Sequence, residues 1–218
     1  MKSFLYLYFT FTFLLWGNDS QYQPKLFNSL ELVYEDDFNQ DGTYNKDHWE
    51  VHQSTTWIQK GGILHGSESS KEFQKKKLAS SDPTHAGFRP VIFLKPVPKE
   101  FVVQLRIRYT GEYKRKNQTP LMDLGHHLQS FCFGKDKTVL KLHKTKNETV
   151  KNLDFQVDQW MEVTAEIKKG QMVLVVNGKE HTFQDDLIDL KESLQIDFKG
   201  LDFGTIELDW VKLYKGIN

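Results

Sequence analysis

Residues 161–183, MEVTAEIKKGQMVLVVNGKEHTF, contain three short strands joined by two tight turns. Apolar and polar side chains alternate over residues 161–168, which is the period of two expected of a half-buried β-strand. Lys169-Gly170 then reverses the chain, and Asn177-Gly178 is a strong signal for a two-residue hairpin turn. The stretch therefore predicts consecutive antiparallel strands.

The same period recurs along most of the chain. In residues 101–109, FVVQLRIRY, the apolar side chains fall on one face, and Gln104, Arg106 and Arg108 fall on the other. Short segments of this kind, separated by turns rich in Gly and Asn, are typical of sandwiches and jelly rolls. The further strands that we predict are residues 32–38, 49–52, 57–59, 63–66, 91–94, 128–133, 139–143, 153–157, 194–198 and 206–214.

Helical patterns are nearly absent. Residues 185–193 could form one short helix, and residues 67–77, SESSKEFQKKK, are interpreted as a solvated loop. No internal repeat and no interdomain linker interrupt the strands. The sequence thus predicts an all-β fold, a two-sheet antiparallel β-sandwich of the jelly-roll type, forming a single domain over residues 21–218.

The first twenty residues have a different character. Met1-Lys2-Ser3 is a short positive start, residues 4–16 are uncharged and rich in aromatic side chains, and a polar segment follows. The apolar run is short for a membrane span, so we interpret residues 1–20 as a signal peptide rather than an uncleaved anchor. We expect a secreted or periplasmic protein with no membrane span in the mature chain.

Composition narrows the choice of partner. The chain has 218 residues with 29 basic and 29 acidic side chains, and this balance argues against a nucleic-acid ligand. One cysteine, Cys132, cannot form an internal disulfide, so the fold must depend on its apolar core. A neutral exported sandwich suits an uncharged partner such as carbohydrate.

An acidic segment follows the first predicted strand. Residues 37–42, DFNQDG, match the first half of an EF-hand loop, but His48 stands where that loop needs a bidentate Glu. Two interpretations remain: an acidic turn after a strand, which composition favours, and a looser calcium site. The sequence requires no other cofactor.

Paired histidines stand at the start of another predicted strand. In a strand, the adjacent side chains of His126 and His127 would point to opposite faces and could not share a metal ion. Zinc would need further ligands, for which Asp123 and His143 are the nearest candidates, but no compact spacing supports it. We expect one imidazole to line a polar groove and the other to be packed or solvated.

Catalytic motifs are weak. There is no G-x-S-x-G nucleophile elbow, and Cys132 lies between two phenylalanines, as a structural residue does. Residues 207–212, ELDWVK, approach the E-x-D-x-x-E motif of laminarinase-type jelly-roll hydrolases, but Lys212 replaces the second Glu. A lysine there removes the proton donor, so this mechanism is rejected.

Three separated stretches resemble one family. These are residues 35–38 with 49–51 and 57–64, then Gly125, His127 and Leu128 with Lys141 and Lys144, and residues 160–179 with 204–214. Together they resemble the 3-keto-disaccharide hydrolase-type domain of the concanavalin A-like lectin/glucanase superfamily. His126 departs from the family's pattern. The resemblance covers nearly all of the mature chain through scattered Trp, Gly and Asp positions. It implies a two-sheet jelly roll whose concave face meets an oligo- or polysaccharide.

The resemblance also implies site residues. His127 matches the family's strand histidine, and we take His127 and Asp123 as acid/base candidates. Asp209 matches a closing-strand aspartate that would share a calcium ion with Asp36 or Asp37. Two functions stay open, a hydrolase and a non-catalytic glycan-binding or protein-interaction module. The expected substrate-binding residues, which would line one polar face with the acid/base pair, are Arg106, Arg108, Lys141 and His143, with Trp57 as an aromatic platform.

Overall fold

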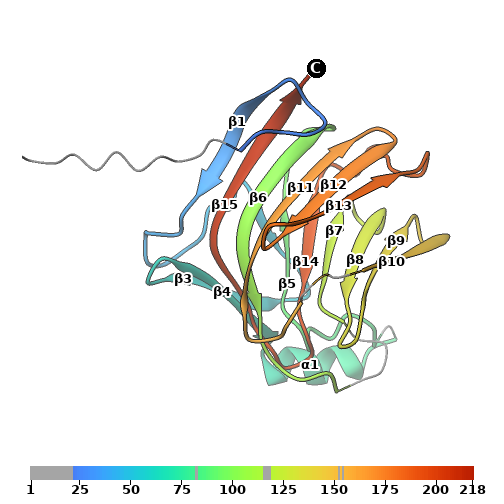
Figure 1. Cartoon of the computed structure of the whole chain (residues 1–218). Helices are drawn as coiled ribbons and strands as arrows, with labels where there is room; N and C mark the ends of the chain where they lie inside the picture. Colours follow the sequence, from blue (N-terminus) through green and yellow to red (C-terminus); the bar gives the residue numbers. More distant parts are fainter. Residues whose placement is uncertain (1–21, 82, 115–118, 152, 154) are drawn as a thin grey trace, which may run out of the picture.

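The computed structural model describes residues 22–218 except residues 82, 115–118, 152 and 154. Two antiparallel β-sheets pack face to face (Figure 1). This arrangement confirms the predicted all-β sandwich. The expected signal peptide, residues 1–20, lies outside the described residues. Within them, no helix is both long enough and apolar enough to cross a membrane.

The first sheet has the order β13-β12-β11-β6-β15-β4-β3, and β1 also pairs with β15. The hairpins predicted around Gly170 and Asn177-Gly178 connect β11, β12 and β13. The strands are β1 (Ser29–Asp36), β3 (Thr55–Lys60), β4 (Ile63–Ser69), β6 (Phe101–Tyr109), β11 (Trp160–Lys168), β12 (Gln171–Val176), β13 (Lys179–Gln184) and β15 (Ile206–Ile217).

The second sheet has the order β10-β9-β8-β7-β14-β5-β2. Its central strands are short and buried on both faces over much of their length. The strands are β2 (Trp49–Val51), β5 (Val91–Leu94), β7 (Leu121–Leu124), β8 (Gln129–Phe133), β9 (Thr138–Leu142), β10 (Lys146–Val150) and β14 (Ile196–Lys199).

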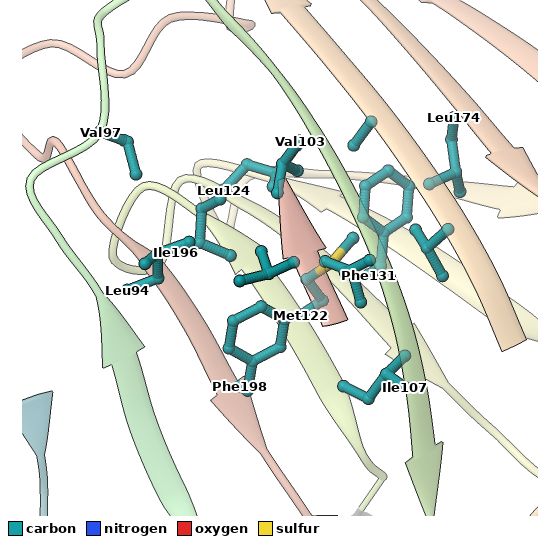
Figure 2. Close-up of a cluster of buried hydrophobic side chains, with 14 of the residues drawn as sticks. Leu94, Val97, Val103, Ile107, Met122, Leu124, Phe131, Leu174, Ile196 and Phe198 are labelled. Atoms are coloured by element: carbon teal, nitrogen blue, oxygen red, sulfur yellow. The ribbon is translucent and has the colours of Figure 1, made fainter. Parts of the chain in front are cut away.

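The core lies between the sheets. Phe101, Val103, Leu105, Ile107 and Tyr109 alternate along β6, and all five are buried, as their period of two predicts. Figure 2 shows apolar side chains of the two sheets meeting between them. The side chains labelled there include Leu94, Met122, Leu124, Phe131, Ile196 and Phe198 from the second sheet, and Val103, Ile107 and Leu174 from the first.

Strand β15 is the longest and joins several parts of the first sheet. It pairs with β6 over nearly its full length, with β1 along its C-terminal half and with β4 near its start. A bulge between Leu208 and Trp210 interrupts its pairing with β6. The sheet therefore divides on one side of β15, where β4 and β1 occupy successive parts of the same edge.

A buried carboxylate fixes the segment that precedes β1. Glu166, on the outer face of β11, is fully buried and accepts hydrogen bonds from the Lys25 amide at 2.8 Å and the Leu26 amide at 2.8 Å. The Tyr22 hydroxyl donates to the same carboxylate at 2.5 Å. Burial and this carboxylate raise the pKa of Tyr22. The first described residues are thus held against the first sheet.

Three expectations from the sequence are wrong. Residues 67–77 are not a loop, since they include the end of β4 and most of helix α1 (Lys71–Leu78), which lies at the lower end of the sandwich in Figure 1. The expected helix at residues 185–193 consists of turns and extended chain. The described part of the strand expected at residues 153–157 is irregular.

Candidate functional site

A row of polar side chains crosses the outer face of the second sheet. The strand register places Asp123 on β7 directly beside Asp197 on β14 and Ser130 on β8. Ser130 in turn lies beside Lys141 on β9. Because alternate side chains of a strand share a face, the neighbours Met122 and Phe198 point the opposite way, into the core. The outer face of the second sheet therefore concentrates ionisable groups.

Two fully buried carboxylates share one lysine. Lys199 Nζ lies 3.1 Å from Asp123 Oδ2 and 3.3 Å from Asp197 Oδ2. Both aspartate side chains are 0% exposed, and the lysine side chain is 6% exposed. Removal of such charges from water is costly unless they are paired and hydrogen-bonded, as these are. Asp123 Oδ1 is the exception, since it is buried without a hydrogen-bond partner among the described residues.

The paired histidines form part of a turn rather than a strand. Residues 125–128, GHHL, connect β7 to β8, with Gly125 at φ 75° and His127 at φ 60°. In a turn, successive side chains need not alternate between faces, and both imidazoles line the same cleft, with ring centroids 4.0 Å apart. The expectation that they point to opposite faces is wrong for this reason.

Each histidine lies above one of the buried aspartates. His126 Nδ1 lies 2.6 Å from Asp197 Oδ2, and the His126 amide donates to Ser193 Oγ at 2.7 Å. An ionised carboxylate only accepts hydrogen bonds, so the proton of this contact is on His126 Nδ1. His127 Nδ1 lies 3.6 Å from Asp123 Oδ2. Both rings are partly open to solvent, with side-chain exposures of 45% and 43%.

The environment of His127 favours its neutral form. Burial, Lys199 and His126 together lower the pKa of His127 from 6.5 to about 4, although Asp123 acts in the opposite direction. At pH 7 this ring is therefore uncharged and can accept a proton or a hydrogen bond. The neutral imidazole of His127 thus lies at the surface of the cleft, and the carboxylates of Asp123 and Asp197 lie buried beneath the two histidines.

A broad cleft of about 1220 Å³ lies over this cluster. Its floor includes a series of rings: His52 stacks on Phe93 at 3.8 Å between centroids, and Phe93 lies 5.6 Å from His126. Phe93 is itself buried beneath His52, so the partly exposed rings of His52 and His126 are the flat surfaces of this floor on which the C–H faces of sugars can pack. The volume exceeds that of a typical small-molecule pocket and is large enough for several sugar rings.

The structure separates the predicted polar face into two places. Arg106 and Arg108 lie on the outer face of the first sheet, where Arg106 pairs with Asp209 at 2.5 Å and Arg108 pairs with Glu207. Both guanidinium groups stack over the Trp160 ring, at 4.8 and 4.7 Å. The expectation that they share one face with Asp123 and His127 is wrong, because the strands belong to opposite sheets. The ELDWVK segment lies in β15, also away from the cleft.

Of the remaining binding candidates, Lys141 shares the outer face of the second sheet with Asp123. His143 Nε2 lies 3.3 Å from Gln129 Nε2 at the end of β9. Trp57 is not an exposed platform, since it is 8% exposed. It lies in the first sheet, on β3, directly opposite Gly66 on the paired strand β4. The small glycine leaves room for the indole there.

The expected calcium ligands do not come together. Asp36 accepts hydrogen bonds from the Tyr34 hydroxyl at 2.7 Å and the Phe38 amide at 2.9 Å, and Asp209 pairs with Arg106. Asp37 accepts from Asn39 within its own turn. Across the part of the chain that the structure describes, no group of three or more His, Cys, Asp or Glu residues could hold a metal ion.

Sequence reasoning missed several residues of the site. Asp197 and Lys199 fall in or next to the predicted strand 194–198, where they alternate with the apolar Ile196 and Phe198. That alternation was a usable signal for the face that they share, but the pairing of β14 with β7 was not visible. Phe93 lies in the fully apolar run VIFL, which shows no face at all.

Comparisons with known proteins agree on the architecture. No protein-family model matches the sequence, and no curated protein matches it. The chain is structurally similar to SCLam, a non-specific endo-β-1,3(4)-glucanase from family GH16, with a TM-score of 0.58 at 14% identity over 89% of this chain and 94% of that one. The fold that the two share is a two-sheet antiparallel jelly roll.

Two further structures are similar. One comes from a study of endo-acting O-glycanases that members of the human gut microbiota use to initiate mucin breakdown, with a TM-score of 0.60, 12% identity, and coverage of 86% of this chain and 100% of that one. The other is a GlcNAcα1-4Gal-releasing endo-β-galactosidase from Clostridium perfringens, with a TM-score of 0.59, 10% identity, and coverage of 91% and 66%. At these identities the likeness shows the fold. None of these structures supports the 3-keto-disaccharide hydrolase family specifically.

Proposed function

We propose that this protein is carbohydrate-active: it binds an oligosaccharide in the cleft on the second sheet and cleaves a glycosidic bond there. The observation that carries the proposal is the His126–His127 pair, with each exposed imidazole set against a buried aspartate on the cleft floor. His127, neutral at pH 7, accepts a proton from the attacking water, and His126 donates a proton to the leaving glycosidic oxygen.

Within this mechanism the aspartates are positioning residues. Asp123 and Asp197 are 0% exposed, so they act through the rings that they hold rather than by contact with substrate. An aspartate that fixes the tautomer and orientation of a catalytic histidine is a familiar arrangement in hydrolases. Asp123, a proton-transfer candidate on sequence grounds, thereby receives a supporting role.

Glycan binding without cleavage is the second candidate. Hydrolysis by two carboxylates needs both groups to reach the sugar, about 5–10 Å apart. Here Lys199 bridges the two aspartates, and neither is accessible from the cleft. A two-carboxylate mechanism is therefore not open to this site, and this observation favours glycan binding without cleavage. The partly exposed rings of His52 and His126, which both line the cleft, support binding in either case.

Incubation with laminarin, cellulose and mucin oligosaccharides and with a 3-keto disaccharide tests the proposal, with release of reducing ends as the measurement. We expect His127→Ala to lower turnover by about 10²-fold or more, the contribution typical of general acid–base catalysis. Binding by calorimetry without turnover would support the second candidate, and neither binding nor turnover on any glycan would reject both. We also propose that the protein acts outside the cytoplasm, which N-terminal sequencing of exported protein would test.

A further inference from the structure

The walls of the cleft carry an excess of cations. Four lysine or arginine side chains line it, against one acidic side chain, Glu192. The four cations come from helix α1, the segment before β5, the loop before β14 and β14 itself. They are Lys77, Arg89, Lys191 and Lys199. The chain as a whole has a formal net charge of zero, so this local excess is a property of the cleft.

Arg89 is a partly buried cation of the cleft wall. It stands just before Pro90 and β5, and among the described residues its guanidinium makes no hydrogen bond or ion pair. Burial lowers the pKa of Arg89, while Asp202 and Asp123 oppose this shift through their charges at longer range. A guanidinium group has five donors in a planar fork, and such a group withdrawn from water normally finds an acceptor. Its donors are available to a ligand in the cleft.

The negative charges of the site lie beneath the surface. Asp123 and Asp197 are fully buried and are held by Lys199 and the histidines. Lys199 is buried together with these two aspartates, so its charge is already paired. A ligand in the cleft therefore meets the other three cations, Lys77, Arg89 and Lys191, against Glu192.

We propose that the natural ligand is an acidic glycan, whose carboxylate or sulfate ester binds Arg89, with Lys191 as a second cationic contact. This inference rests on the proposed function and names its substrate class. Arginine forms paired hydrogen bonds with planar carboxylates and with sulfate oxygens, so it is suited to both groups. Lys191 is exposed and comes from a loop about one hundred residues away in sequence, so the two contacts can engage separate anionic sugars.

Calorimetric titration of the full-length mature protein tests the inference with three tetrasaccharides: an oligogalacturonate, a sulfated galactan fragment and the neutral laminaritetraose. We expect either acidic probe to bind at least ten-fold more tightly than the neutral one at 50 mM salt and to lose most of that advantage at 500 mM salt. The preference between the two acidic probes identifies the anionic group as carboxylate or sulfate.

Arg89→Gln and Lys191→Gln should each reduce the affinity for the acidic probe about ten-fold and leave that for laminaritetraose within about two-fold. Lys60→Gln is the matched control, since it removes the same charge from an exposed site at the end of β3, on the other sheet. Thermal unfolding of each variant is measured in parallel. Should Arg89→Gln fail to fold, the exposed Lys191→Gln still provides the test.

The outcomes separate the two proposals. Equal affinity for neutral and acidic probes, with no salt dependence, overturns the acidic-glycan inference and leaves the proposed function in place. Tighter binding of the neutral laminaritetraose than of the acidic probes also overturns the inference and leaves the proposed function in place. Absence of binding to every carbohydrate overturns the proposed function, and the inference falls with it.

Discussion

At the scale of single residues, His127 links the site to the stability of the fold. Its pKa is about 4 in the folded protein, against an ordinary value of 6.5. Between these pH values the unfolded chain binds a proton that the folded chain does not, so stability must rise with pH across this window. The stabilising effect is fully present above about pH 6.5 and is lost as the pH falls towards 4.

We therefore predict that the free energy of unfolding of the wild type falls between pH 7 and pH 4 more steeply than that of His127→Gln. Urea denaturation at several pH values measures both. Carboxylates distant from His127 contribute equally to the two curves, so the difference reports the imidazole together with its contact to Asp123. Parallel curves would show that His127 titrates near its ordinary value.

Asp123 gives a second prediction at this scale. Asp123→Asn retains the side-chain volume but removes a negative charge. In the wild type that charge pairs with Lys199 and raises the pKa of His127. We expect a loss of about 2 kcal/mol of stability and a further drop in the pKa of His127. Denaturation and NMR titration of the imidazole measure the two effects. Asp197→Asn is the comparison variant. It should also lower stability, but its effect on the histidine pair should be larger at His126, which contacts Asp197, than at His127.

At the scale of elements, Glu166 holds the segment before β1. Glu166→Gln leaves a weaker acceptor for the Lys25 and Leu26 amides and for the Tyr22 hydroxyl. We expect these two amides to exchange with solvent deuterium about ten-fold faster, since hydrogen bonds to charged groups are worth about 1.5–3 kcal/mol. Glu162→Gln is the control, because Glu162 lies on the same face of β11 but is exposed. Equal exchange in both variants would contradict the prediction.

The contact between Trp57 on β3 and Gly66 on β4 gives another prediction at the scale of elements. A Cβ at Gly66 would lie 2.3 Å from the Trp57 ring, so Gly66→Ala must displace the indole. We expect a loss of about 2 kcal/mol and a red shift of tryptophan fluorescence. Gly178→Ala is the matched substitution: it has open space around it but a φ of 79°, so about 1 kcal/mol of backbone strain and no fluorescence change are expected.

Several elements could be predicted from sequence and others could not, for physical reasons. Strands β5 and β6 were predicted residue for residue, because their apolar or alternating patterns leave one interpretation. Helix α1 was missed because KEFQKKKL has no apolar stripe. Only Gln74 within it is buried, and its clearest helical signal is the Ser70 cap, which accepts from the Phe73 amide. Strand β10, KNETV, is an edge strand with little apolar content to reveal it.

The candidate site was predictable only within one stretch of chain. Asp123 and His127 were identified together because they lie four residues apart in sequence. Asp197 is remote from both, and its place beside Asp123 depends on the pairing of β14 with β7. Arg106 and Arg108 were assigned to the wrong face because alternation shows which side chains share a face, but not to which sheet a strand belongs.

At the scale of the whole molecule, one apolar cluster extends across both sheets. It includes Phe101 and Ile107 from the first sheet and Phe131 and Phe198 from the second. We expect residues 21–218 to unfold in a single cooperative transition, as the prediction of one domain requires. Tryptophan fluorescence and far-ultraviolet circular dichroism should give coincident urea curves. Two separated midpoints would reveal independent units.

The position of β15 has a consequence for how the chain is made. The strand that β1, β4 and β6 all require follows every one of them in sequence, and Ser29 pairs with Ile217, 188 residues later. The first sheet cannot close until residues 206–217 have been synthesised, and contacts between residues so distant in sequence form slowly. Strands β1, β4 and β6 therefore lack the strand that joins them throughout the synthesis of the residues that precede β15.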